Sequence, residues 1–165
     1  MSSKRAKSEL AIIDATGRVV RRVTVADPSL GLRGADLSGL SAPLAQLQGL
    51  DLSGVNLYWA SLADADFSFA NLADADLRGA TLCRAKCHNT NFRRANFSRD
   101  NLNGRTDLRG ADLSTSELAD ANLTDALYDD ATKFPSQFSP AANGMVHVDD
   151  LPPGDPAAED LRIIR

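Results

Sequence analysis

The sequence is poor in the residue types that most often carry chemistry or fill large cores. It holds two cysteines, two histidines and one tryptophan among 165 residues, and aromatic residues make up only 5% of it. Two cysteines cannot supply a disulfide framework. A core with so few rings must consist mainly of leucine and alanine, which suits a narrow interior filled by small repeated layers.

Long apolar runs and an excess of basic charge are also lacking. No apolar run reaches the length of a membrane span, and residues 1–17 contain basic residues but no stretch of signal-peptide length. We therefore expect a cytoplasmic protein. The formal net charge is -4 and the sequence pI is about 5.1, a balance that argues against a general nucleic-acid binder.

Leucine instead recurs with a period of five residues. The segment ANLADADLRGATL has Leu72, Leu77 and Leu82, each preceded two positions earlier by alanine. An α-helix turns about 100° per residue and would scatter these leucines around its surface. A straight strand would send successive leucines to opposite faces. A common interior is reached only if the chain turns a corner in every repeat, which predicts a solenoid.

The repeat extends over about a hundred residues. Central positions fall at every fifth residue from Leu32 to Leu102 and, after one inserted residue, from Leu108 to Tyr128, which gives 20 repeats without a long loop. Fourteen central residues are leucine, twelve residues two positions earlier are alanine, and twelve directly before the centre are Asp or Asn. Glycines two positions after a centre predict corners with positive φ, at Gly34, Gly39, Gly49, Gly54, Gly79, Gly104 and Gly110.

This tandem A-(D/N)-L-x-x pattern resembles the pentapeptide-repeat family over about residues 30–132. The resemblance implies an all-β fold, a right-handed quadrilateral β-helix with four repeats in each coil. Twenty repeats then make about five coils. With the usual spacing of about 4.8 Å between strands, the rod is roughly 24 Å long.

Solenoids need caps, because the end coils expose unpaired strand edges and bare core. We expect a flexible N-terminus at residues 1–7 and a β-hairpin cap at residues 8–29. The β-helix follows at residues 30–132. Residues 133–165 form a Pro-rich C-terminal extension that is either partly disordered or docked.

No group of residues predicts a metal site, a cofactor site or catalysis. Cys87 is a central residue and points inward, whereas Cys83 and His88 point outward, so the three cannot converge as a structural zinc site requires. No nucleophile, base and orienting acid recur at a spacing that the corners would bring together. The Asp and Asn residues before the centres predict local hydrogen bonds to the backbone at the corners.

Asp100 interrupts the pattern, because it occupies an inward position that is usually alanine. The extra residue near Arg105 falls one repeat later. An inward carboxylate is costly unless it is hydrogen-bonded. We therefore predict a bulge over residues 100–106 in which Asp100 accepts hydrogen bonds from freed backbone amides.

Outward aromatic and basic residues are the candidate partner-binding positions. Aromatic side chains are enriched at interfaces, although the N-terminal hairpin or the C-terminal extension is an alternative cover for them. From Arg78 to Arg109 there are eight basic residues and two acidic ones, a local balance of +6, for which a solvated belt without a partner is the alternative interpretation. The candidates are Tyr58, Trp59, Phe69, Arg78, Arg93, Arg94 and Arg99.

These features predict a non-catalytic scaffold that binds a protein partner. The resemblance implies an alternative, a DNA mimic that binds type II topoisomerases such as DNA gyrase and protects them against topoisomerase poisons. Duplex DNA of this length carries about fourteen charges, and the coils hold fourteen acidic but also nine basic residues, a net of -5. A lesser alternative is nucleic-acid binding through the basic belt. The open coil ends also favour a homodimer through a coil end or the C-terminal extension.

Overall fold

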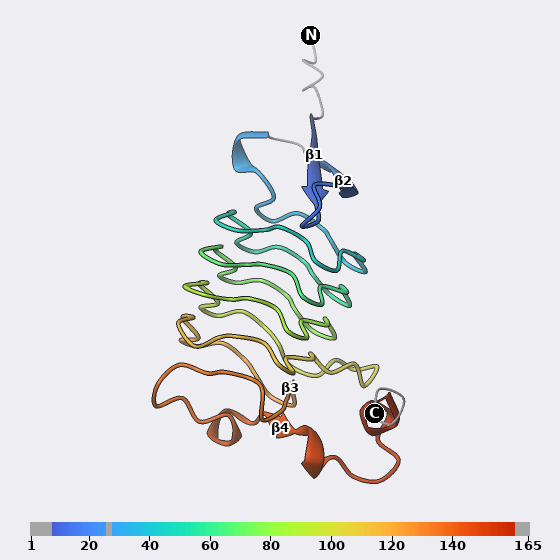
Figure 1. The fold of residues 1–165 in the computed structure, drawn as a ribbon, viewed down its shortest axis with the longest axis vertical. Helices are drawn as coiled ribbons and strands as arrows, with labels where there is room; N and C mark the ends of the chain where they lie inside the picture. The colour runs from blue at the N-terminus through green and yellow to red at the C-terminus, as the bar shows by residue number, and fades with distance from the viewer. Residues whose placement is uncertain (1–7, 26–27, 161–165) are drawn as a thin grey trace.

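The computed structural model describes residues 8–25 and 28–160 and shows a chain wound into stacked coils (Figure 1). The expected flexible segment 1–7 lies outside the described residues. Within these ranges, no helix is both long and apolar enough to cross a membrane. The regular elements are β1 (Ser8–Ile13), β2 (Val19–Val25), η1 (Pro28–Leu30), β3 (Leu127–Tyr128), η2 (Ala141–Asn143), β4 (Val146–His147), η3 (Val148–Asp150) and α1 (Pro156–Asp160).

Successive coils are joined by single parallel bridges between residues twenty positions apart. Asp36 pairs with Asn56, and Asn56 pairs in turn with Asp76. The amide of Leu37 donates a hydrogen bond of 2.8 Å to the carbonyl of Asn56, and the amide of Asn56 donates one of 2.9 Å to the carbonyl of Ala35. Four repeats of five residues therefore complete one coil in this part of the chain.

The interior of the coils is filled by the central residues and by the small residues two positions before them. Leu62, Phe67 and Leu72 are fully buried, and Ala65 and Ala70 are at most 1% exposed. Their common burial confirms that the chain turns back toward one axis in each repeat.

Most corners are tight turns whose third residue has positive φ. The carbonyl of Leu57 accepts a hydrogen bond of 3.0 Å from the amide of Ala60, and Trp59 between them has φ of 55°. Phe69 has φ of 63° and Gly54 has φ of 66° at equivalent positions. These values are those of type II turns. A side chain with this φ costs about 1–2 kcal/mol, so the corners tolerate residues other than glycine at the expense of some strain.

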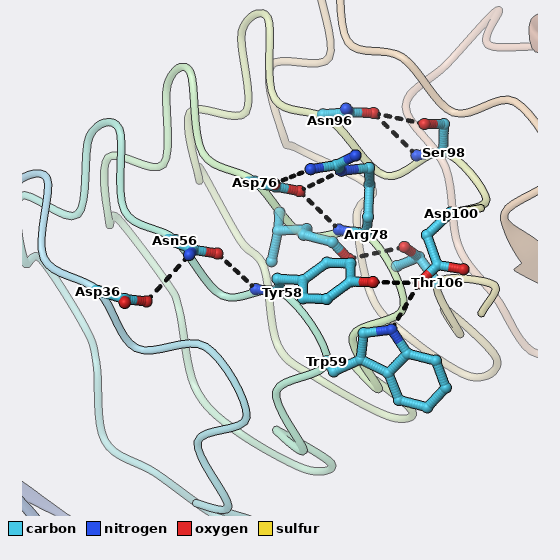
Figure 2. Close-up of polar contacts among 11 residues, drawn as sticks. Asp36, Asn56, Tyr58, Trp59, Asp76, Arg78, Asn96, Ser98, Asp100 and Thr106 are labelled. Atoms are coloured by element: carbon cyan, nitrogen blue, oxygen red, sulfur yellow. Dashed lines mark hydrogen bonds and ion pairs between the residues drawn. The ribbon is translucent and has the colours of Figure 1, made fainter. Parts of the chain in front are cut away.

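The Asp and Asn side chains before the centres bind the backbone, as the sequence predicts. In each case a side-chain oxygen accepts a hydrogen bond from the amide two residues further on. Neighbouring coils are also linked, since the Asn56 amide group donates to Asp36 at 3.0 Å (Figure 2). The residues that bind the backbone in this way are Asp36, Asp51, Asn56, Asp66, Asn71, Asp76, Asn91, Asn96, Asp107, Asp112 and Asn122.

Residues 100–105 leave the coil, and we call them the inserted loop. The bridge partner of Thr81 is Asp107, a step of 26 residues instead of 20. Leu102 is 70% exposed, so its prediction as a central residue is wrong. The count of 20 repeats is therefore one too high, and the loop lies within the bulge predicted for residues 100–106. Thr106 takes the buried small position and Leu108 the central one, and φ of Gly104 is not positive because this glycine lies in the loop.

The N-terminal end carries the hairpin of β1 and β2. The two strands pair antiparallel, and Ile12 and Val23 are buried against the first coil. Among the described residues, one backbone hydrogen bond joins the hairpin to the strand edge of that coil, donated by the Gln46 amide to the carbonyl of Ile13 at 2.8 Å. The hairpin therefore covers the core of the first coil but only part of its strand edge.

The C-terminal end is closed by the segment after β3, drawn in orange at the bottom of Figure 1. Strand β4 pairs parallel with β3, with Leu127 opposite Val146. Met145 is buried, and the rings of Phe134 and Phe138 stack at 5.1 Å and pack against the core. The described part of the C-terminal extension thus docks on the last coil.

Candidate functional site

The carboxylate of Asp100 collects four hydrogen bonds at the base of the inserted loop. Its Oδ1 accepts from the amides of Leu102 at 2.9 Å and Gly104 at 2.6 Å. Its Oδ2 accepts from the Tyr58 hydroxyl at 2.7 Å and from Trp59 Nε1 at 2.6 Å (Figure 2). The prediction that Asp100 caps freed amides is confirmed, and the two aromatic donors are a finding that the sequence did not predict.

The electrostatics of this cluster favour an ionised Asp100. Burial acts to raise the pKa of Asp100, but the hydrogen bonds from Trp59, Tyr58 and the loop amides together hold it below its ordinary value. The hydrogen bond to Asp100 in turn raises the pKa of Tyr58. The Arg78 guanidinium lies 5.5 Å from the centroid of the Tyr58 ring, within the range of a cation–π contact.

The indole of Trp59 rests on two glycines from later parts of the chain. A Cβ atom at Gly104 would lie 2.6 Å from Trp59 Cζ2, and one at Gly79 would lie 2.9 Å from Nε1. Both contacts are too short for a real side chain, so glycine is required at each position. Gly79 and Gly104 therefore fix the position of the indole, and the indole in turn packs against the inserted loop.

Alanine substitution at two matched glycines measures how much the packing of the Trp59 indole on Gly79 contributes to stability. Gly54 and Gly79 have φ of 66° and 69°, but only at Gly79 would the new Cβ meet Trp59. We expect Gly54→Ala to cost about 1 kcal/mol from backbone strain, and Gly79→Ala to cost about 2 kcal/mol more because it displaces the hydrogen-bonded indole. Urea unfolding followed by Trp59 fluorescence measures both, and equal losses for the two variants would contradict the prediction.

A groove lies beside this cluster, with a volume of about 400 Å³. Its floor is one side of three successive coils, because Ser61 pairs with Thr81 and Thr81 with Asp107. Trp59 and the inserted loop form its wall, and the first residues of α1 also line it. The side chains that line it include those of Trp59, Ser61, Thr81, Arg105, Asp107 and Arg109.

Arg105 joins the inserted loop to the C-terminal segment. Its side chain is 8% exposed and forms ion pairs with Asp125 at 3.3 Å and with Asp155 at 3.2 Å. The side chain of Asp155 is equally buried. The residue directly before α1 is thereby tied to the groove wall, fifty positions away in the sequence.

The structure brings together some of the predicted partner-binding residues and separates others. Tyr58, Trp59 and Arg78 form one cluster, and Arg99 donates a hydrogen bond of 2.8 Å to Asn103 in the inserted loop. Phe69, 68% exposed, follows Trp59 by ten residues, which is half a coil. Arg93 and Arg94 belong to a further corner. Gly104 of the inserted loop lies against the indole of Trp59, which remains 48% exposed.

The basic belt is largely neutralised by ion pairs within the coils. Asp64 and Asp74 bind arginines of the next coil through paired hydrogen bonds of 2.7 to 2.8 Å. Each contact places a carboxylate beside a guanidinium, so the positive charge of the belt is locally smaller than its residue count implies. The belt arginines paired in this way are Arg78 with Asp76, Arg84 with Asp64, Arg94 with Asp74, Arg105 with Asp125 and Asp155, and Arg109 with Asp107.

The cysteines and His88 occupy the positions expected from the repeat. Cys87 is fully buried in the interior, while Cys83 and His88 are half-buried. Burial raises the pKa of Cys83 to about 12, which keeps this thiol protonated and unreactive at neutral pH. Among the described residues, no three His, Cys, Asp or Glu side chains lie close enough together to hold a metal ion.

Comparison with known proteins identifies the repeat. A family model described as pentapeptide repeats matches residues 32–63 and 60–99. A pentapeptide repeat protein from Nostoc PCC 7120 is 28% identical, with a TM-score of 0.43 over 68% of this chain and 84% of that one. One from the thylakoid lumen of Arabidopsis thaliana is 28% identical, with a TM-score of 0.47 over 72% and 75%. QnrB1, a plasmid-mediated fluoroquinolone resistance protein, is 19% identical, with a TM-score of 0.33 over 80% and 83%. No curated protein matches the chain.

Proposed function

We propose that this chain is a pentapeptide-repeat protein and a non-catalytic scaffold, a right-handed quadrilateral β-helix of about five coils that binds a protein partner. The observation that carries the proposal is the groove beside Trp59, whose wall is fixed by the hydrogen bonds to Asp100. A preformed wall reduces the ordering cost of association. The partner therefore meets a surface that is already in its binding shape.

The chemistry of the groove suits an extended peptide segment. Its floor crosses three coils, about 10 Å at the usual strand spacing, which is roughly the length of three extended residues. Ser61 and Thr81 offer hydroxyl groups, and Trp59 offers a half-exposed ring. Tryptophan, tyrosine and arginine are the residue types that dominate binding energy at protein interfaces.

The ion pairs of the belt weigh against the other two hypotheses. A nucleic-acid ligand needs free cations to replace its counterions, but Arg84, Arg94 and Arg109 are each bound to an Asp. A DNA mimic needs free carboxylates, and the same contacts neutralise those of Asp64, Asp74 and Asp107. Protein binding through the groove requires neither free cations nor free carboxylates.

A groove-blocking variant tests the proposal. Ser61→Arg places a long side chain on the exposed groove floor without touching the core, and Ala119→Arg places the same side chain at an exposed site outside the groove. We expect a partner captured by the wild-type chain from lysate of its source organism, and identified by mass spectrometry, to be lost with Ser61→Arg and retained with Ala119→Arg. A partner list unchanged by Ser61→Arg would contradict the role of the groove.

A gyrase supercoiling assay, with and without a fluoroquinolone, separates the topoisomerase hypothesis from the proposal. We expect no inhibition and no protection at micromolar protein. Either effect would favour the DNA-mimic hypothesis. If Ser61→Arg left that effect intact, the groove would not be the binding surface for gyrase.

A further inference from the structure

The last described residues of the chain are attached to the coils by a single ion pair. We call residues 152–160, which include α1, the terminal strap. Among the residues that the structure describes, the pair between Arg105 and Asp155 is the only polar contact of the strap with the rest of the chain. A helix of five residues is not stable on its own. The position of the strap therefore depends on this pair and on the packing around it.

Asp155 leaves one hydrogen bond of the Arg105 guanidinium unmade. The Nε and Nη2 atoms of an arginine share one edge, to which both oxygens of a carboxylate can bind side by side. Asp64 binds Arg84 in this way, at 2.8 Å and 2.7 Å. At Arg105 only Nη2 donates to Asp155, at 3.2 Å, whereas Nε is buried without a hydrogen-bond partner among the described residues.

The incomplete pair has a cause in the strap itself. The Oδ1 of Asp155 accepts a hydrogen bond of 3.0 Å from the amide of Ala157 in the first turn of α1, which leaves Oδ2 for Arg105. A carboxylate that has no helix amide to bind can offer both of its oxygens to Nε and Nη2. Because bidentate pairs between arginine and carboxylate are the strong ones, such a carboxylate holds this edge more firmly than Asp155 does.

The strap also covers part of the groove. Pro156 and Ala157 line the groove together with Arg105, and α1, drawn in red in Figure 1, lies next to the inserted loop. The side chains of Arg105 and Asp155 are each 8% exposed, so the docked strap shields the guanidinium from solvent. A partner reaches the edge formed by Nε and Nη2 only when the strap moves aside.

We propose that the terminal strap is an internal competitor for the groove, and that the partner carries an acidic side chain whose carboxylate displaces Asp155 from Arg105. This inference rests on the proposed function, because it concerns the same groove. The exchange of one carboxylate for another leaves the local charge balance unchanged. Asp125 binds Nη1 at 3.3 Å, so the guanidinium keeps its orientation when Asp155 leaves.

Titration with two short peptides tests the proposal. The probes are acetyl-Ala-Val-Glu-Val-Ala-amide and the same peptide with Gln in place of Glu, and the signal is the indole N–H resonance of Trp59, the one tryptophan in the sequence. Asp155→Asn removes the charge of the competitor but keeps a side chain that can cap α1. Asp150→Asn is the matched control, because Asp150 is exposed and forms no ion pair with a described residue.

We expect the Glu peptide to bind Asp155→Asn at least about tenfold more tightly than wild type, because a weakened competitor leaves more of the chain in the binding-competent state. Asp150→Asn should bind it as wild type does. The Gln peptide should bind Asp155→Asn at least about tenfold more weakly than the Glu peptide, since it lacks the charge-assisted pair.

The outcomes separate this inference from the proposed function. Equal binding of the two peptides to Asp155→Asn would overturn the inference but leave the groove as a peptide site. Equal binding of the Glu peptide to Asp155→Asn and Asp150→Asn would also overturn it, as would a Trp59 resonance that no peptide shifts. In that last case the proposed function would still be decided by the capture experiment with Ser61→Arg.

Hydrogen exchange of the wild-type chain gives a second measurement that needs no variant. The amides of Ala157 and Ala158 bind Asp155 within the docked strap, so they should exchange faster when the Glu peptide is in excess. The amide of Val146, which donates to the carbonyl of Ala126 at 2.9 Å, should keep its rate. Bound Glu peptide with unchanged exchange at Ala157 and Ala158 would overturn the displacement of the strap.

Discussion

Replacing Asp100 with alanine is expected to lower the free energy of unfolding by about 3 kcal/mol, because four partly buried donors lose a buried, ionised acceptor at once. The donors are the Tyr58 hydroxyl, Trp59 Nε1 and the amides of Leu102 and Gly104. For a chain of this size the loss corresponds to a melting temperature lower by roughly 6–12 °C. Urea unfolding measures the change. Trp59 is the one tryptophan in the sequence, so its emission should also shift to the red.

Asn101→Ala is the matched control, because Asn101 is the exposed neighbour in the same loop. It should change stability by less than about 0.5 kcal/mol. If Asp100→Ala cost no more than this control, the carboxylate would not be what holds the loop.

The effect of Asp100→Ala should depend on pH in a defined direction. The folded pKa of Asp100 is lowered, so its stabilising contribution is fully present above the unfolded value of about 3.9. That contribution is lost as the pH falls through the folded pKa. The gap in stability between wild type and Asp100→Ala should therefore shrink as the pH is lowered from about 5 to below 4.

Phe92→Ala is expected to have the largest effect on stability, a loss of about 3–5 kcal/mol, because it removes a fully buried ring from the interior of the coils. The Phe92 ring meets the Phe97 ring edge to face, with centroids 5.2 Å apart, and such a contact adds about 0.5–1.5 kcal/mol to the burial. Because neighbouring coils interlock around each central residue, the cavity cannot close by local repacking.

Phe69→Ala is the control for this substitution. Phe69 is 68% exposed at a corner, so the same change in side chain should alter stability by less than about 0.5 kcal/mol. Thermal unfolding followed by circular dichroism measures both variants. Similar losses for Phe92→Ala and Phe69→Ala would mean that the interior packs more loosely than its burial indicates.

The interior and the corners could be predicted from the sequence because they depend on local patterns. Leu72, Leu77 and Leu82 recur with a period that only a corner in every repeat can gather inside. The Asp and Asn residues before the centres bind amides two residues away, so their role follows from short-range chemistry. The hydrogen-bonded state of Asp100 was predictable for a similar reason, since a buried carboxylate requires donors.

The inserted loop was harder to predict because its sequence imitates a repeat. Leu102 follows Asn101 and precedes Gly104 by two positions, as a central residue should, and the loop is only one residue longer than a repeat. What removes it from the coil is a set of contacts with Trp59 and Tyr58, more than forty positions earlier. Two coils of twenty residues before Asp100 lies Ala60, next to Trp59. Counting back along the coils in this way would have placed Tyr58 and Trp59 near Asp100.

The insertion also shows where this architecture accepts changes in length. Each coil contacts only the coils before and after it, and the bridge from Asn96 to Asn122 shows that the ladder continues past the loop. Extra residues at a corner therefore alter one stretch of surface and leave the stacking above and below in register. New surface features can be acquired at any such corner one at a time, without redesign of the remaining rod.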